Sequence, residues 1–248
     1  MACYDYKAGK ERVNAILSNV LSVIEKDKLP SIDQLTFENG YKSFVTAIFV
    51  DIRDSTSLFT EENKEKVSKI IRSFTSEIIE ILRDDKNLRE VGIRGDCVYA
   101  IYTTPKKGDI SECVDKAIFI NTYLRMLNRL LSEKNYPSIT SGIGVASAKE
   151  LIVKAGRKGS GINNPVWIGN AVTGAANLSS IANKNGNGPI ALSTMTYSNS
   201  IESLKRKNIG DNVESWFGRF YNDKVGYYYS ANIEKDAFSQ WIEDGMEV

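Results

Sequence analysis

The sequence predicts an α+β fold in which short apolar strands and long helices follow the order β-α-β-β-α-β. Two observations carry this prediction. Apolar residues at helical spacing define two long helical segments, and four short runs rich in β-branched residues lie around them. Hydrophobic residues make up 42% of the 248-residue chain and charged residues 25%, which suits a globular protein with a buried core.

The first third of the chain is expected to hold a peripheral helix, a strand and a core helix. The peripheral helix is amphipathic and ends before Pro30, with apolar positions Val13, Ile16, Leu17, Val20, Leu21 and Ile24. Residues 31–43 are expected to form a polar connector and residues 44–50 a buried strand. A long helix is predicted from Thr56 to about Leu82, with an apolar stripe of Ile70, Ile71, Phe74, Ile78, Ile81 and Leu82.

The middle of the chain completes the core pattern. Strands at 88–93 and 97–102 flank Arg94-Gly95-Asp96, which is expected to be a tight hairpin tip. A second long helix is predicted from 109 to about 131, followed by a strand at 138–146. This order is the ferredoxin-like supersecondary plan.

The C-terminal part is expected to add smaller elements. These are a strand at 151–155, a helix near 170–184, a strand at 189–192, a hairpin across 214–231, and a peripheral tail that includes Trp241. The glycine-rich run 156–161 lacks the Gly-Lys-Ser/Thr ending of a P-loop. We therefore interpret it as a flexible exit from the strand, within reach of a partner subunit.

Composition excludes several kinds of chemistry. The chain has no histidine, which excludes a histidine-based triad, an imidazole general base and histidine-ligated zinc. With 32 basic and 31 acidic side chains, net charge favours neither nucleic acid nor membrane as a partner. No apolar stretch is long enough to insert into a membrane, and the first residues lack a signal core. Three cysteines, Cys3, Cys97 and Cys113, without a CxxC pair, favour a reduced cytoplasmic chain.

Two aspartates stand at predicted strand ends. Asp51 follows the strand 44–50 and precedes a helix start, where backbone N–H groups and the helix dipole favour phosphate. Asp96 follows Gly95 at the hairpin tip. Each alone fits an ordinary turn acid, but together they suit divalent cations bound to a triphosphate. Asp54 is interpreted as a helix N-cap, or as an acid that orients the metal ligands without binding the metal itself.

The loop Asp51-Ile52-Arg53-Asp54-Ser55-Thr56 and the pair Gly95-Asp96 resemble the metal-binding loops of class III nucleotidyl cyclases. The first loop of that family reads roughly Asp-Ile-x-Gly-Phe-Thr, so Asp54 replaces its Gly and Ser55 its Phe. The resemblance implies that Asp51, the Ile52 carbonyl and Asp96 hold two divalent cations, Mn²⁺ or Mg²⁺. Ser55 and Thr56 would then face the substrate.

The run 165–177 also resembles this family, with Gly169, Asn170, Val172 and Ala175 in its frame. Its functional positions differ. Gly92 stands where purine cyclases carry the Lys or Glu that reads the base, and Val166 where they carry the partner acid. Thr173 replaces an Asn, and Asn177 replaces the transition-state Arg. Both are the positional candidates for that catalytic role.

A changed base pocket explains these differences better than the loss of an activity whose metal acids persist. Arg94 adds a bidentate donor near the same hairpin, and we expect it to contact the base or a phosphate, together with backbone groups near Val50 and Gly92. Arg219 or Lys224 would supply positive charge to the phosphates, although each also fits a solvated hairpin residue.

This pattern resembles the Pycsar group, the bacterial pyrimidine cyclases used against phage, over about residues 44–232. The resemblance implies conversion of UTP or CTP to 3′,5′-cyclic UMP or CMP and pyrophosphate by two-metal catalysis, and a product that acts on a separate, membrane-associated effector. It implies a homodimer with active sites at the interface, metals from one chain and Thr173 and Asn177 from the other. The predicted domains are 1–43 (N-terminal helix and connector), 44–232 (catalytic) and 233–248 (tail).

Two other functions stay open. The first is an adenylate or guanylate cyclase with an atypical base pocket, which the changes at Gly92 and Val166 disfavour. The second is a catalytically inactive dimeric module that senses nucleotides, which Asn177 favours and the intact Asp51 and Asp96 disfavour. The residues do not decide between UTP and CTP, and we favour UTP.

Overall fold

The computed structural model describes residues 4–58 and 64–247. Its helices are α1 (Tyr6–Ser18), α2 (Ser55–Leu58), α3 (Lys64–Arg83), α4 (Lys107–Glu133), α5 (Asn170–Ile181), α6 (Thr194–Lys207) and α7 (Asp236–Glu243). Its strands are β1 (Ser22–Glu25), β2 (Asn39–Ile52), β3 (Leu88–Arg94), β4 (Cys97–Thr103), β5 (Ser141–Gly156), β6 (Asn163–Ile168), β7 (Ile190–Ser193), β8 (Gly218–Asn222) and β9 (Gly226–Ala231). The predicted α+β fold is confirmed.

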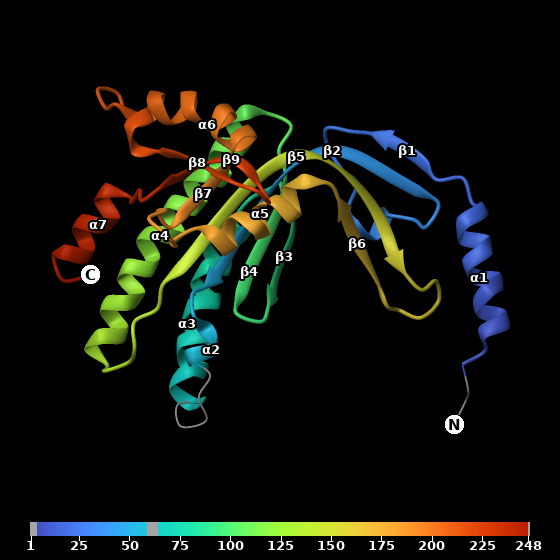
Figure 1. Cartoon of the computed structure of the whole chain (residues 1–248), viewed down its shortest axis with the longest axis horizontal. Coiled ribbons are helices and arrows are strands. Elements are labelled where there is room, and N and C mark those ends of the chain that lie inside the picture. Colours follow the sequence, from blue (N-terminus) through green and yellow to red (C-terminus); the bar gives the residue numbers. More distant parts are fainter. Residues whose placement is uncertain (1–3, 59–63, 248) are drawn as a thin grey trace.

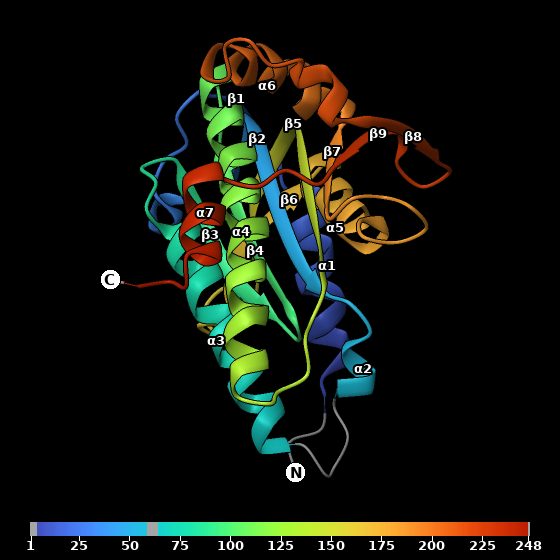
Figure 2. The same cartoon turned by 90° about the vertical axis from the view of Figure 1, so that its left-hand side faces the viewer.

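A single mixed sheet holds these strands in the order β3-β4-β2-β5-β7-β9-β8, with β1 beside β2 and β6 beside β5. Side chains of β2 alternate between its two faces. Ile48 and Val50 pack among residues of α3 and α4, on what we call the helical face. Val45 and Ala47 pack among residues of α5, on the α5 face. Figure 2 shows α3 and α4 on one side of the sheet and α5 on the other.

The β5 strand is continuous where the sequence predicted two separate strands. It pairs with β2 from Gly40↔Val153 to Ile52↔Ser141. The polar segment that suggested a break is accommodated inside the fold, because the Ser147 hydroxyl bonds those of Thr46 and Thr196 at 2.8 and 2.9 Å. The prediction of a break near 147–150 was therefore wrong.

The glycine-rich run is the turn of a hairpin and not a strand exit. The Arg157 N–H donates to the Ile162 carbonyl at 3.0 Å, and β6 then pairs antiparallel with the outer part of β5. β6 was not predicted from the sequence. In Figure 1, β6, β1 and the outer ends of β2 and β5 extend away from α3 and α4, toward α1.

The N-terminal prediction also needs correction. α1 ends at Ser18, and the apolar run that seemed to continue it forms β1, which pairs parallel with β2 from Ser22↔Asn39 to Glu25↔Lys42. The supposed connector 31–43 accordingly contains a 3-10 turn at Ile32–Gln34 and the start of β2. Pairing with a remote strand overrode the helical spacing of these residues.

Two further predictions fall in the helices. The helix predicted from Thr56 to Leu82 corresponds to α2 and α3, and its part at 59–63 lies outside the described residues. α6 was not predicted from the sequence. The predicted tail contains α7, which contacts α4. Arg125 of α4 pairs with Glu234 and Glu243 at 2.8 Å each, and Ile242 is buried.

Candidate active site

Asp51 is the second-last residue of β2, and it lies on the α5 face of the sheet. Its backbone is paired with Cys97 of β4 and with Gly142 of β5. The Arg53 guanidinium lies 3.3 Å from the Asp51 carboxylate. Burial and the negative charge of Asp96 nevertheless raise the pKa of Asp51. The fold thus places Asp51 and Asp96, the two predicted metal ligands, close enough for their negative charges to repel each other.

These groups fit a hard divalent cation, which prefers carboxylate and carbonyl oxygens. A cation beside Asp51 would relieve the repulsion from Asp96 that raises its pKa. Within residues 4–58 and 64–247, no group of three or more His, Cys, Asp or Glu residues is placed to bind a metal. Asp51, Asp96 and the Ile52 carbonyl would therefore form a partial ligand set, which triphosphate oxygens can complete.

The loop after Asp51 keeps a shape that glycine normally provides. Asp54, which replaces the glycine of the cyclase loop, has a left-handed backbone with φ +51°. Its carbonyl accepts from the N–H of Ser57 at 3.0 Å. Ser55 and Thr56 are the first residues of the four-residue helix α2 that follows. Asp54 thus adopts the turn without the glycine.

Gly92 and Arg94 of β3 share the α5 face with Asp51. Gly92 is paired with Tyr99, and Tyr99 with Phe49, two residues before Asp51. A Cβ atom at Gly92 would lie 2.7 Å from the Tyr99 ring. Tyr99 of the neighbouring strand therefore covers Gly92, the position that the cyclase resemblance assigns to a purine-reading side chain, and a larger residue there would have to displace the ring.

A polar group at the edge of this surface was not predicted from the sequence. The Tyr99 hydroxyl donates to Glu90 Oε1 at 2.7 Å, and the Trp167 indole N–H donates to Glu90 Oε2 at 2.8 Å. The Tyr99 ring stacks on Phe49, with ring centroids 5.3 Å apart. Trp167 comes from β6, next to Val166, which is exposed. Alternation along β3 was the only local signal that placed Glu90 on this face.

The predicted catalytic residues of α5 line a separate cavity. Thr173, Asn177 and Lys224 are among the residues around a hollow of about 520 Å³ between α5, α6 and the β8–β9 turn. The Thr173 hydroxyl donates to the Gly169 carbonyl at 3.0 Å. Arg219, the other candidate cation, instead lies over the Tyr227 ring at 4.1 Å. Lys224 is therefore the better placed of the two.

The α5 cavity begins further along β5 than the strand position opposite Asp51. Asp51 is opposite Gly142 on β5, whereas the α5 cavity begins at Ala146, four residues further along. That spacing corresponds to about 14 Å along a strand. Val50 points away from Asp51 and from the cavity, because its side chain is fully buried on the helical face. Only its backbone can contribute to the site.

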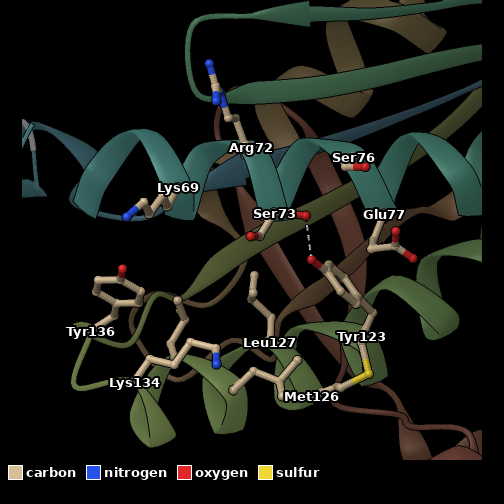
Figure 3. Close-up of a pocket in the computed structure, with 12 residues that line it drawn as sticks. Lys69, Arg72, Ser73, Ser76, Glu77, Tyr123, Met126, Leu127, Lys134 and Tyr136 are labelled. Atoms are coloured by element: carbon tan, nitrogen blue, oxygen red, sulfur yellow. Dashed lines mark hydrogen bonds between the residues drawn. The ribbon is translucent and has the colours of Figure 1, made fainter. Parts of the chain in front are cut away.

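A second hollow lies on the helical face, away from the α5 face that carries Asp51. It has a volume of about 510 Å³ and lies between α3 and α4, as Figure 3 shows. The Tyr123 hydroxyl crosses it to the Ser73 carbonyl at 2.7 Å. The predicted site residues lie elsewhere, so this hollow has no part in the candidate site.

The fold and the paired acids define a nucleotide cyclase catalytic domain. Residues 38–212 match the family described as the adenylate and guanylate cyclase catalytic domain. The chain belongs to this family and is a nucleotide cyclase, so the resemblance to the class III nucleotidyl cyclases is confirmed.

Similar proteins extend the comparison. The chain is 55% identical to a protein named uridylate cyclase from Treponema porcinum, over 98% of this chain and 82% of that protein. It is 28% identical to a uridylate cyclase from Gulbenkiania mobilis, over 97% of this chain and 96% of that protein. The solved guanylyl cyclase Cya2 superposes with a TM-score of 0.61 at 16% identity, over 79% of this chain and 95% of the other. That likeness concerns the fold alone.

Proposed function

We propose that this chain is a uridylate cyclase, which converts UTP to 3′,5′-cyclic UMP and pyrophosphate. The observation that carries the proposal is the Tyr99 ring packed over Gly92, where a longer side chain would be needed to read a purine. A pocket shortened by this ring suits a one-ring base. The names of the two similar proteins above support the same substrate.

In this proposal, Asp51, the Ile52 carbonyl and Asp96 hold two divalent cations, Mn²⁺ or Mg²⁺. Bound cations would neutralise the triphosphate and make the ribose 3′-hydroxyl more acidic. Asn177 would donate a hydrogen bond to the reacting phosphate, Thr173 would do so once its hydroxyl turns away from the Gly169 carbonyl, and Lys224 would add positive charge. Arg94, Ser55 and Thr56 would orient the substrate, and positioning would carry most of the rate enhancement.

We further propose a homodimer with active sites at its interface. The support is the separation of the acids from the α5 cavity within one chain, which a second copy would overcome. Each site would then take its acids from one chain and Thr173 and Asn177 from the other.

The biological setting belongs to the same proposal. A cyclic pyrimidine nucleotide would act on a separate, membrane-associated effector in defence against phage, as the Pycsar resemblance implies. A cytoplasmic location is supported by the free thiols of Cys97 and Cys113. None of the helices in the described part of the chain is long and apolar enough to cross a bilayer.

Product analysis tests the substrate. Purified protein is incubated separately with ATP, GTP, CTP and UTP, each with Mn²⁺, and products are identified by mass spectrometry. We expect cyclic UMP. Cyclic AMP or cyclic GMP as the main product would overturn the pyrimidine assignment. No product from any nucleotide would favour the inactive module.

Single substitutions test the acids. Asp51→Ala and Asp96→Ala should each lower cyclase activity at least about a thousandfold, because each removes a charged metal ligand. Asp84→Ala is the matched control, since Asp84 is an exposed acid after α3 and should leave activity unchanged. Residual activity above a tenth of the wild-type rate in either acid variant would contradict the metal assignment.

A further inference from the structure

The carboxylate of Glu90 is held on the α5 face by two neutral donors. Tyr99 binds one oxygen and Trp167 the other, at 2.7 and 2.8 Å. A carboxylate has about four acceptor positions, so two donors leave acceptor capacity on both oxygens. The two aromatic side chains fix the direction of the carboxylate without neutralising its charge.

Glu90 stands at the edge of the surface on which a base would lie. It is two residues before Gly92 on β3, and the stacked rings of Tyr99 and Phe49 lie beside it. Stacked aromatic rings give a sequence-tolerant platform for a nucleobase. A base resting on these rings would direct its polar edge toward Glu90 or toward Arg94, on the same strand face.

We propose that Glu90 is the residue that selects uracil over cytosine, by accepting a hydrogen bond from the N3–H of the base. This inference rests on the proposed uridylate cyclase function. Uracil presents N3–H between two carbonyl groups, whereas neutral cytosine has an unprotonated N3 acceptor at that position. An ionised carboxylate can only accept, so it matches uracil and repels the cytosine lone pair.

Base size is selected by a different group. Guanine also presents an N–H beside a carbonyl, so the Glu90 carboxylate alone would not exclude GTP. The Tyr99 ring covers Gly92, which leaves less room over this strand for the second ring of a purine. Tyr99 thus limits the size of the base and positions Glu90, while Glu90 reads the edge of the base.

The test compares kcat/KM for UTP and CTP in the full-length protein. Glu90→Gln keeps the size of the side chain but removes the charge and adds a donor. We expect kcat/KM for UTP to fall about 10- to 100-fold, as for loss of a charge-assisted hydrogen bond, and kcat/KM for CTP to change less than about threefold or to rise. The UTP/CTP ratio should therefore fall by at least about tenfold.

Two further variants separate base recognition from structure. Glu112→Gln changes an exposed acid of α4 on the helical face and should leave the ratio unchanged. Trp167→Phe keeps an aromatic ring but removes the indole donor to Glu90, and should lower the ratio about threefold. Thermal unfolding of each variant, followed by circular dichroism, verifies that it folds.

The outcomes distinguish this inference from the proposed function. If the wild type makes cyclic UMP and Glu90→Gln leaves the UTP/CTP ratio unchanged, Glu90 does not read the base and the inference fails alone. An equal loss of kcat/KM for both nucleotides would also overturn it, since that result indicates a structural role. If the wild type makes no cyclic UMP, the proposed function fails and this inference fails with it.

Discussion

At the residue scale, Glu150 is an acid that the fold buries completely. It lies on β5, and its Oε1 accepts the Ala171 N–H at the start of α5 at 2.5 Å. Its Oε2 is buried without a hydrogen-bond partner. A Cβ atom at Gly169 would lie 2.6 Å from Oε1, so glycine is needed beside it. Burial raises the pKa of Glu150, while the Ala171 N–H opposes that rise.

This pKa shift predicts a pH dependence of stability. The pKa of Glu150 in the folded state lies above its ordinary value of 4.5, so the unfolded state loses the proton more easily. The contribution of Glu150 to the free energy of unfolding is therefore fully present below pH 4.5, and it declines as pH rises through the folded pKa.

Urea unfolding of wild type and Glu150→Gln between pH 4 and pH 7.5 measures the effect. The free energy of unfolding of wild type relative to the variant should decrease as pH rises. Asp51, whose pKa is also raised, is present in both proteins and cancels in the difference. A difference that stays constant with pH would contradict the prediction.

At the scale of elements, α5 packs unusually close to β5. A Cβ atom at Gly144 would lie 2.1 Å from the Ala175 carbonyl oxygen, and one at Gly142 would lie 2.3 Å from the Ser179 carbonyl oxygen. These obstacles belong to the helix backbone and cannot move as a flexible side chain can. Because Gly142 and Gly144 have no side chains, α5, which carries Thr173 and Asn177, can pack this closely against β5.

Gly144→Ala should force α5 away from the sheet. We expect the free energy of unfolding to fall by about 2 kcal/mol, the typical cost of overpacking. Cyclase activity should also fall, because Thr173 and Asn177 move with α5. Urea titration and a steady-state assay measure both effects.

Gly108→Ala is the control for that change. Gly108 lies in the first turn of α4, and its added Cβ would meet nothing within 4 Å. Alanine should raise the free energy of unfolding by about 0.5 kcal/mol, because it favours helix. Equal stability of the two alanine variants would show that the close approach of α5 carries no cost.

Some elements could be predicted from the sequence and others could not. The core helices α3 and α4 and the strands β3 and β4 were predicted because their periodicity is local and strong. β1 and β6 were not, because their pairing with β2 and β5 depends on residues that are remote in the chain. The same reason made β5 look like two strands.

At the scale of the whole molecule, the arrangement of site residues predicts complementation between inactive chains. Asp51→Ala and Asn177→Ala damage different halves of the proposed interfacial site. In a mixed dimer, one site combines both damaged halves and the other combines two intact halves. Random mixing should therefore restore about a quarter of wild-type activity, from the symmetry of a two-fold dimer.

The measurement mixes the two purified variants in equal amounts after they have been allowed to exchange subunits. Activity well above that of either variant alone is the expected result. Mixing Asp51→Ala with Asp96→Ala is the control, because both changes damage the same half of the site and no intact site can form. Recovery in the control, or none in the test mixture, would contradict an interfacial site.

The sequence by itself determined the family, the β-α-β-β-α-β order and the positions of Asp51 and Asp96. Each of these depends on short motifs or on local periodicity, which a chain displays without its fold. The tertiary structure decided the continuity of β5, the burial of Glu150, the closure of Gly92 by Tyr99 and the contact of Glu90 with Trp167. Those features depend on which remote residues the sheet brings together, because burial and hydrogen bonding are set by neighbours in space.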